Sequence, residues 1–375
     1  MPAVTLQLDL RPYRLRFRSP FRTAFGVLVE RAGILVAVSG PDGPVGWGEA
    51  APLPGFGGEA IARSPTVLRL LADEAPSWPP LDSPPEIAAL LLDLEARFPD
   101  APCARAAIEQ ALADRAARLA GLPLWRWLRR AWSPADDAEA VDAVVAVNAT
   151  VGAEDPSAAA EQALAAVAAG YRTLKVKLDG APERDAARMA AVRAAVGPGV
   201  ALRADANGAW DEALAERMLG ALAPLGLEYV EQPLPTGQST EAVSACAQAM
   251  FRLRRLGVPL AADEILLAPG GPEAVLESGA AEVLILKPHL LGGLSAAARL
   301  ATAGRAAGLD VVVTSAMDAA VGRMGATHLA AALALRRACG LATGALLAED
   351  VAESPRELDG CIPLPSGAGL GLTPA

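Results

Sequence analysis

The sequence predicts an α/β fold in which a barrel of parallel strands follows a smaller α+β domain. Two observations lead to this prediction. From about residue 141, short apolar runs alternate with alanine-rich helical windows at nearly constant spacing, which is typical of a closed parallel barrel. In the same region, several successive apolar runs end in a charged residue, as expected if each strand delivers one side chain to a common site at one end of a barrel.

The N-terminal part of the chain is predicted to form the α+β domain. Three segments have the composition of strands, and Pro41-Asp42-Gly43 is typical of the turn between the second and the third. Between residues 60 and 130 the apolar pattern becomes helical, with a proline-rich interruption at 76–85. The predicted strands lie at residues 4–18, 33–39 and 45–49.

The barrel is predicted to contain eight strands alternating with seven helices. We assign residues 1–135 to the α+β domain and residues 136–344 to the barrel. Residues 345–375 are rich in glycine and proline and are expected to pack back on the first domain. The predicted strands lie near residues 143–148, 173–178, 200–205, 228–231, 259–263, 283–287, 310–315 and 340–344. The predicted helices lie near residues 156–169, 183–195, 211–223, 238–256, 272–278, 294–307 and 321–336.

The composition favours a small molecule as the ligand. The chain has 375 residues, and its net charge of −10 and pI near 4.9 argue against nucleic acid or an anionic membrane as a partner. Four cysteines without a CxxC pair suggest neither a disulfide framework nor a zinc site. Because no signal-peptide pattern and no stretch of about 18 apolar residues occurs, we expect a cytoplasmic protein. The sequence leaves open whether it forms a homo-oligomer.

Two lysines begin the series of charged strand ends. Lys175 and Lys177 are two residues apart, so on a strand they share one face, while the apolar residues between and beside them share the other. In a barrel the apolar face must meet the helices, which directs both lysines inward, toward the end where barrel enzymes hold their active sites. An isolated Lys-x-Lys is more often part of a solvent-facing edge strand. The pair therefore indicates a site only together with the charged residues that follow.

Three acidic residues continue the series. Arg203 and Asp205 share one face of the next predicted strand, which opens into a loop at Asn207. Glu231 and Asp263 also end apolar runs. One acid in such a place is more often a helix N-cap, but three on consecutive strands would repel each other in a partly desolvated site and therefore call for a cation. Ligation by oxygen alone favours Mg²⁺.

Lys287 ends the next apolar run and would lie roughly opposite Lys177 in a closed barrel. This arrangement suits removal of a proton α to a carboxylate, in which the metal and Lys287 stabilise the enolate while a lysine takes the proton. The pKa of free lysine is about 10.4, so a lysine base must have a lowered pKa at neutral pH. The charge of Lys175 and of the cation would lower the pKa of Lys177.

These residues resemble the enolase superfamily, in the branch that includes muconate-lactonising enzymes. Within that branch the chain is most similar to the family of o-succinylbenzoate synthases. The superfamily resemblance is carried by Lys175-Val176-Lys177, Asp205-Ala206-Asn207, Glu231-Gln232-Pro233, Asp263-Glu264 and Leu286-Lys287-Pro288. The narrower resemblance is carried by the stretches Pro20 to Gly26, Gly46 to Phe56 and Thr314 to Arg323, the first two of which correspond to capping loops.

The resemblance implies a modified TIM barrel, (β/α)7β, under an N-terminal α+β capping domain. It implies a lyase that dehydrates 2-succinyl-6-hydroxy-2,4-cyclohexadiene-1-carboxylate to o-succinylbenzoate, in the biosynthesis of menaquinone or phylloquinone. Lys177 would abstract the α-proton and then protonate the departing hydroxyl, Lys287 would stabilise the enediolate, and Lys175 would assist. The implied Mg²⁺ ligands are Asp205, Glu231 and Asp263, the implied substrate contacts are Arg203, Asn207, Ser315 and Met317, and Glu264 would lie behind the ligands.

Several alternatives stay open. An N-succinylamino acid racemase would use the same scaffold, metal site and lysines, and one protein could have both activities. A dipeptide epimerase is less expected, because only Asp318, and no Asp-x-Asp, follows the seventh predicted strand. In another class, a Schiff-base aldolase would use Lys177 or Lys287 as a nucleophile without a metal, and a binding protein could keep the scaffold without catalysis. His289 and His328 fall outside the charged series and are assigned to structure.

Overall fold

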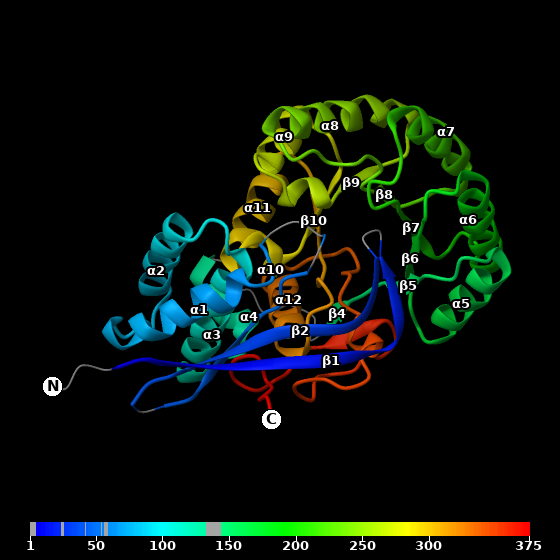
Figure 1. Ribbon diagram of the computed structural model, residues 1–375. Helices are drawn as coiled ribbons and strands as arrows, with labels where there is room; N and C mark the ends of the chain where they lie inside the picture. Colours follow the sequence, from blue (N-terminus) through cyan, green and yellow to red (C-terminus); the bar gives the residue numbers. More distant parts are fainter. Residues whose placement is uncertain (1–4, 24–25, 42, 54, 56–58, 133–143) are drawn as a thin grey trace.

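The computed structural model describes residues 5–23, 26–41, 43–53, 55, 59–132 and 144–375. A three-stranded antiparallel sheet with helices packed on it lies against a curled seven-stranded parallel sheet that is ringed by helices (Figure 1). The chain therefore has the predicted α/β architecture, a capping domain followed by a barrel of βα units. The predicted domain boundary at residue 135 lies outside the described residues and stays a prediction.

The capping sheet is longer than the sequence predicted. Its strands are β1 (Gln7–Thr23), β2 (Gly26–Ser39) and β3 (Gly46–Ala50), joined in that order. The first two strands extend well beyond the predicted segments, because the stretch between them, expected as a capping loop, pairs as an antiparallel hairpin up to Thr23 and Gly26. Part of the predicted turn, Asp42, lies outside the described residues.

The described part of the capping domain has four helices, of which α1 and α3 pack directly on this sheet. The central one, α3, is almost completely buried between β3 and the barrel. It approaches β3 so closely that a Cβ atom on Gly48 would collide with the carbonyl oxygen of Ala107, so glycine is required there. The helices are α1 (Arg63–Glu74), α2 (Pro84–Arg97), α3 (Pro102–Leu119) and α4 (Leu124–Trp132).

The barrel strands pair in chain order and in parallel. They are β5 (Ala149–Val151), β6 (Thr173–Lys177), β7 (Ala201–Asp205), β8 (Tyr229–Glu231), β9 (Leu260–Ala262), β10 (Val283–Leu286) and β11 (Asp310–Val313). The helices are α5 (Pro156–Ala168), α6 (Pro182–Val196), α7 (Glu212–Leu222), α8 (Thr240–Leu253), α9 (Gly271–Ser278), α10 (Pro288–Leu291), α11 (Leu294–Ala306) and α12 (Ala320–Ala332). The short helix α10 was not predicted. Short 3₁₀ turns are η1 (Ala75–Ser77), η2 (Ala223–Leu225), η3 (Arg254–Leu256), η4 (Glu264–Leu267) and η5 (Gly344–Leu346).

Local sequence explains where several of these helices begin. The side chain of Asp155 accepts hydrogen bonds from the first backbone N–H groups of α5, and Asp211 and Ser239 do the same for α7 and α8. Such caps satisfy donors that have no partner within the helix.

The predicted eighth strand at 340–344 is wrong in its extent. Only Cys339 and Gly340 pair there, through isolated parallel bridges to Val147 on one side and Thr314 on the other. These bridges connect the two edges of the parallel sheet. Two residues are enough to connect the edges of the sheet, because each edge strand needs only a few backbone hydrogen bonds where it meets Cys339 and Gly340.

The predicted first barrel strand at 143–148 is misplaced, and its first residue lies outside the described part of the chain. Val144–Ala146 form β4, which pairs antiparallel with the tail strand β12 (Cys361–Pro363), and Val147 makes the isolated bridge to Cys339. The first strand of the parallel sheet is β5, which begins just after the predicted range. The tail also contacts the capping domain, since the backbone N–H of Gly369 donates to Leu122 O at 2.8 Å and that of Leu370 donates to Asp114 Oδ1 at 2.6 Å.

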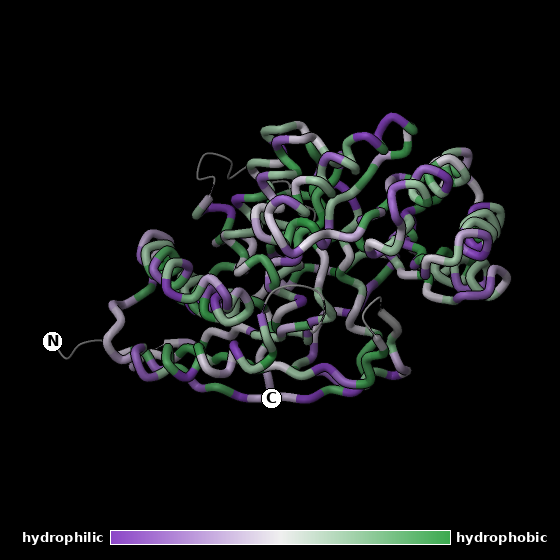
Figure 2. The backbone as a smooth tube through the Cα atoms, turned by 45° about the horizontal axis from the view of Figure 1, so that its top comes forward, coloured by the Kyte–Doolittle hydropathy of each residue, from purple (hydrophilic) through white to green (hydrophobic). Residues whose placement is uncertain are grey.

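The interior of the barrel is filled by side chains. Tyr229, Ala261, Val283, Ile285 and Val312 form a separate buried apolar cluster inside it, while a larger core joins the sheet to the surrounding helices. Hydrophilic positions recur along the outer helices (Figure 2). The filled interior leaves the end at which the strands terminate as the place for a site. Among the described residues, no helix is long and apolar enough to cross a membrane.

One buried histidine joins the barrel, the capping domain and the tail. His328 of α12 accepts a hydrogen bond at Nδ1 from the backbone N–H of Trp125 at 3.2 Å, so its other nitrogen carries the proton and donates to Leu370 O at 3.2 Å. Burial lowers the pKa of His328 to about 4. The neutral ring is thus fully satisfied, and a second proton would face the Trp125 N–H.

We expect His328 to destabilise the protein in mild acid. Its pKa is lower in the folded chain than in the unfolded chain, so the unfolded chain binds more protons between about pH 6.5 and pH 4, and the free energy of unfolding falls in that window. From pH 7 to pH 5 the loss assigned to His328 is about 2 kcal/mol. Urea unfolding of wild type and His328→Gln at both pH values measures it, because glutamine can make both hydrogen bonds without titrating. Equal pH dependence in the two proteins would contradict the assignment.

Candidate active site

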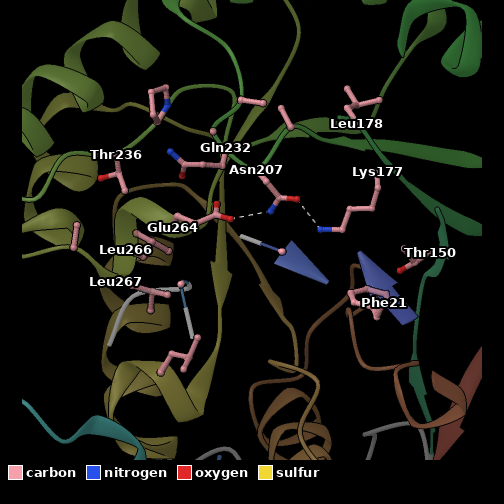
Figure 3. A pocket seen from close by; sticks show the side chains of 18 of the residues that line it. Phe21, Thr150, Lys177, Leu178, Asn207, Gln232, Thr236, Glu264, Leu266 and Leu267 are labelled. Atoms are coloured by element: carbon pink, nitrogen blue, oxygen red, sulfur yellow. Dashed lines mark hydrogen bonds between the residues drawn. The ribbon is translucent and has the colours of Figure 1, made fainter. Parts of the chain in front are cut away.

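A pocket opens at the end of the barrel where the parallel strands terminate. Its described lining includes all members of the predicted charged series and the segment Thr314 to Met317. It opens into a larger cleft of about 1420 Å³ between the capping domain and the barrel. Phe21 of β1, Thr150, Lys177, Asn207 and Leu346 line both spaces. Figure 3 shows the cleft, with Lys177 and Asn207 directed into it.

Strand β6 directs its two lysines into the pocket. Leu174 and Val176 are completely buried on the face that meets the helices, while Lys175 and Lys177 share the opposite face. The side chain of Lys177 is 28% exposed and that of Lys175 is 12% exposed. Lys177 is therefore the more accessible of the two amines.

Three buried carboxylates lie side by side next to these lysines. Asp205 and Glu231 end the neighbouring strands β7 and β8 in direct register, and Asp263 follows the end of β9. Their exposures are 0%, 1% and 2%. Since parallel strands terminate at the same edge of a sheet, their last side chains converge.

Ammonium groups lie between and beside the carboxylates. The Nζ atom of Lys175 is 3.0 Å from both Asp205 Oδ2 and Glu231 Oε1, and the Nζ atom of Lys177 is 2.7 Å from Asp205 Oδ2. At the other end of the row, Lys287, which follows β10, forms an ion pair with Asp263. The order along the sheet is thus lysine pair, three carboxylates, lysine.

Burial and mutual repulsion change the acidity of the row. Burial, and then the charge of Asp205, raise the pKa of Glu231 to about 8. Burial also raises the pKa of Asp263. At Asp205 burial acts in the same direction, but Lys175 and Lys177 outweigh it and hold the pKa well below its ordinary value. Glu231 is the carboxylate that most lacks positive charge nearby.

The two buried lysines remain charged. Burial by itself lowers the pKa of Lys175, but Asp205 and Glu231 outweigh it and raise that pKa well above its ordinary value. Asp263 likewise outweighs burial and raises the pKa of Lys287. Both side chains are therefore ammonium groups at neutral pH, suited to stabilising negative charge and not to accepting a proton.

The residues fit a divalent cation by their chemistry. Within the described part of the chain, no three such side chains converge on one point, and lysine amines contact the carboxylates. The donors themselves are adjacent, buried and made of oxygen alone, which is the donor set that Mg²⁺ prefers. The raised pKa of Glu231 marks a place where additional positive charge would be favourable.

A chain of hydrogen bonds holds Lys177 from the side. Its Nζ donates to Asn207 Oδ1 at 2.9 Å, and Asn207 Nδ2 donates to Glu264 Oε1 at 2.8 Å (Figure 3). The backbone N–H of Asn207 donates in turn to Asp205 Oδ1 at 3.1 Å. Asn207 and Glu264 thus orient the lysine, and both also line the cleft.

The predicted substrate contacts in the segment after β11 line the pocket, but Arg203 does not. Ser315, whose Oγ lies 2.7 Å from Thr343 Oγ1, and Met317 are both lining residues. Arg203 is fully buried and is not among the described residues that line the pocket or the cleft. It donates to Glu228 Oε2 at 2.6 Å, at the opposite end of the barrel from the site. The sequence correctly predicted the strand face on which Arg203 lies. Its side chain, however, extends away from the pocket toward Glu228, which precedes β8.

Sequence reasoning missed two features of the site. Gln232 supports Asp263, because its side-chain oxygen accepts from the backbone N–H groups of Asp263 and Ile265 at 3.1 and 3.2 Å. The second feature was visible in the composition. Lys175, Lys177 and Lys287 are the only lysines among the 33 basic residues of the chain, and all others are arginines. Arginine does not lose its proton in proteins, so a chain that otherwise uses arginine keeps lysine where an amine is needed.

Comparison with known sequences identifies both parts of the chain. The family described as "Enolase C-terminal domain-like" matches residues 158–375. The family described as "Mandelate racemase / muconate lactonizing enzyme, N-terminal domain" matches residues 7–128. The two matches correspond to the barrel with its tail and to the capping domain.

Individual relatives differ in the reaction for which they are named. The chain is 45% identical to an o-succinylbenzoate synthase of Thermobifida fusca over 215 residues, which are 56% of this chain and 63% of that protein, or slightly less than two thirds of its length. It is 31% identical to an L-Lys-D/L-Arg epimerase of Methylococcus capsulatus over 97% of this chain and 98% of that one. A dipeptide epimerase of Enterococcus faecalis, solved with Mg and the dipeptide L-Leu-L-Tyr, superposes with a TM-score of 0.86 at 26% identity, covering 98% and 99% of the two chains.

We expect Asp205→Asn to weaken binding of a divalent cation by more than about tenfold, because it removes the carboxylate that lies between Lys177 and Glu231. Titration with Mn²⁺, followed by electron paramagnetic resonance, measures the affinity, and circular dichroism checks the fold. Asp211→Asn is the matched control, since Asp211 is an exposed helix cap on the loop after the same strand. Mn²⁺ binding of wild-type strength in Asp205→Asn would refute the ligand assignment.

Proposed function

The chain belongs to the mandelate racemase and muconate lactonizing enzyme family of the enolase superfamily, and from this we propose that it is an o-succinylbenzoate synthase. The proposed reaction is the dehydration of 2-succinyl-6-hydroxy-2,4-cyclohexadiene-1-carboxylate to o-succinylbenzoate, which begins with removal of the proton α to a carboxylate. The observation that carries the proposal is the row of three buried carboxylates with a lysine at each end, in a chain that has no lysine elsewhere.

Mg²⁺ would be held by Asp205, Glu231 and Asp263, and when bound it would supply positive charge that stabilises the negative charge developing on the substrate. Lys177 is proposed as the base. Its side chain is the most exposed of the three lysines and lines the cleft, and its Nζ is held by Asp205 and Asn207. The same amine, once protonated, can give its proton to the departing hydroxyl.

Lys287 is proposed to stabilise the enediolate from the other end of the row. Its side chain is 8% exposed and remains charged beside Asp263, so it offers a fixed positive charge in a buried site. Lys175 is proposed to keep the row electrically balanced, because its ammonium group contacts both Asp205 and Glu231. The three lysines would thus have different roles that follow from their different exposure.

The surroundings of Asp318 favour the synthase over a dipeptide epimerase. An epimerase must receive the charged amino group of its dipeptide, for which an Asp-x-Asp after the seventh strand was expected. Here only Asp318 follows β11. It is 1% exposed and lies 3.8 Å from the Arg31 guanidinium and 3.4 Å from His289 Nδ1, so its charge is already compensated. The capping-loop residues Pro54 and Phe56, which favoured the synthase at the level of sequence, lie outside the described residues.

An epimerase or racemase is the second candidate, because one of the relatives that match nearly the whole chain is named as an epimerase, while another is named as an o-succinylbenzoate synthase. N-succinylamino acid racemisation would need the same two lysines, one at each end of the row. Dehydration and racemisation differ only after proton abstraction. In the first the intermediate loses hydroxide, and in the second it regains a proton.

Turnover of the cyclohexadiene substrate, followed spectrophotometrically with and without Mg²⁺, tests the proposal. We expect Mg²⁺-dependent product formation and much slower α-proton exchange of N-succinyl amino acids or of Lys- and Arg-containing dipeptides in D₂O. Faster exchange than dehydration would identify a racemase or epimerase. Activity that survives EDTA and is trapped by borohydride as a mass increase at a lysine would instead identify a Schiff-base aldolase.

We expect Lys177→Arg to lower turnover by at least about 100-fold, because arginine keeps the positive charge but cannot act as a base. Proton exchange at the α-carbon should fall in parallel, which separates loss of the base from loss of a later step. Arg184→Lys is a suitable control, since Arg184 is an exposed residue of the loop and helix that follow Lys177, paired with Asp179. Turnover of Lys177→Arg within a few-fold of wild type would exclude Lys177 as the base.

We expect Lys287→Ala to lower turnover by orders of magnitude through loss of the charge that stabilises the enediolate. Because the variant also leaves Asp263 without its partner, its affinity for Mn²⁺ should be kept or increased, and this separates the variant from a collapsed site. Turnover close to wild type would contradict the proposed role.

A further inference from the structure

A second group of charged side chains is buried where the capping domain meets the barrel. We call it the interface cluster. Its members are Tyr13, Arg31 and Glu49 from the capping sheet and His289 and Asp318 from the barrel. The four ionisable members other than Tyr13 are at most 4% exposed. None of the five is among the described residues that line the pocket or the cleft, so the proposed reaction does not account for them.

Arg31 of β2 connects two separate segments of backbone. Its guanidinium donates to Pro52 O at 2.8 Å and to Ala51 O on the capping domain. On the barrel side it donates to Met317 O at 3.1 Å and to Ala316 O at 3.4 Å. One side chain therefore holds the segment after β3 against the loop after β11.

Both of these segments form walls of the pocket. Leu53, which follows Pro52, and Ala316 and Met317 are lining residues. Met317 has a φ of 58°, a left-handed conformation that is unfavourable for this residue type. A strained backbone persists only where its surroundings hold it, and here the Met317 carbonyl is held by Arg31.

The rest of the cluster holds the guanidinium and the adjoining loop in place. Asp318 lies 3.8 Å from Arg31 and accepts a hydrogen bond from the backbone N–H of Ala316 at 3.2 Å. Glu49 accepts from Tyr13 at 2.5 Å and from the backbone N–H of Ala319 at 2.8 Å, so it fixes the start of α12 just after the loop. Burying a charge has a large desolvation free energy, and apolar residues would join the two domains at a lower cost in free energy. What the charges add is a fixed geometry.

We propose that Arg31 is a positioning residue that sets the spacing between the two pocket walls and thereby the fit of the non-reacting part of the substrate. It would touch neither the substrate nor the carboxylate row. The proposal rests on the proposed function only in taking the pocket as the substrate site. Loss of Arg31 would let the walls separate, so that substrate binds more weakly while the lysines and carboxylates, carried by the barrel strands, stay in place.

The test compares Arg31→Met with Arg115→Met. Methionine keeps most of the length of the side chain but removes all donors. Arg115 is the matched control, because it is also 3% exposed in the capping domain, where it pairs with Asp82, and it contacts neither pocket wall. Both variants should lose thermal stability. A change in the accessibility of the pocket that occurs in Arg31→Met and not in Arg115→Met is therefore assigned to the loss of Arg31. Arg31→Lys serves as the milder variant if Arg31→Met fails to fold.

The first measurement uses no substrate. Every lysine of the chain lies in the pocket, so these and the N-terminal amine are the amines that acetic anhydride can acylate, and the N-terminal amine serves as internal standard. Peptide masses then report how accessible Lys175 and Lys287 are, whose side chains are 12% and 8% exposed in the wild type. We expect both to be acylated at least about fivefold faster in Arg31→Met, through easier local opening, and at the wild-type rate in Arg115→Met.

The second measurement is steady-state kinetics. We expect KM of Arg31→Met to rise at least about tenfold with kcat changed by less than about threefold, a smaller rise in Arg31→Lys, and partial recovery of Arg31→Ala by added guanidinium ion. Wild-type labelling in the folded Arg31 variants, or equal effects in Arg31→Met and Arg115→Met, would overturn the proposal. If the wild type does not turn over the cyclohexadiene substrate, the proposed function fails while the labelling still decides the role of Arg31.

Discussion

The site depends on one electrostatic constraint, the placement of three carboxylates side by side in a buried pocket. Asp205, Glu231 and Asp263 end neighbouring parallel strands, so the sheet itself forces them together. They are stable there only with positive charge among them, and Lys175 supplies part of it by contacting two of the three. Glu231 remains the least compensated member, as its pKa of about 8 indicates. The need for positive charge beside these carboxylates is therefore a consequence of the fold.

As a result of this constraint, the charged groups of the pocket and the walls that shape it come from different parts of the molecule. The charged groups come from the barrel strands, whose positions are fixed by backbone pairing on both sides. The walls come partly from the capping domain, through Phe21 and Leu53, and partly from the loop after β11. A change in the walls alters which molecule fits without moving the lysines. The interface cluster, in which Arg31 holds both walls, is thus where the fit of the substrate is proposed to be set.

The barrel could be predicted from the sequence because its signals are local. Each βα unit has an apolar run of strand length followed by an alanine-rich window, and most predicted elements lie within a few residues of the observed ones. The predictions failed where pairing partners are distant in the chain. β4 leaves the predicted first strand to pair with β12, more than 200 residues later, and the eighth strand is reduced to bridges at Cys339 and Gly340. Nothing local distinguishes an apolar run that pairs along its length from one that pairs at two residues.

The sequence by itself determined which side chains share a face of each strand, because alternation along a strand depends only on residue number. That was enough to direct Lys175, Lys177 and Asp205 inward as a group. Only the tertiary structure decided how far each side chain reaches, since this depends on partners from other elements. Arg203 and Lys175 are paired in register, yet the lysine extends up to the carboxylates while the arginine turns down to Glu228. Long flexible side chains follow the nearest opposite charge, and that charge is known only once the chain is folded.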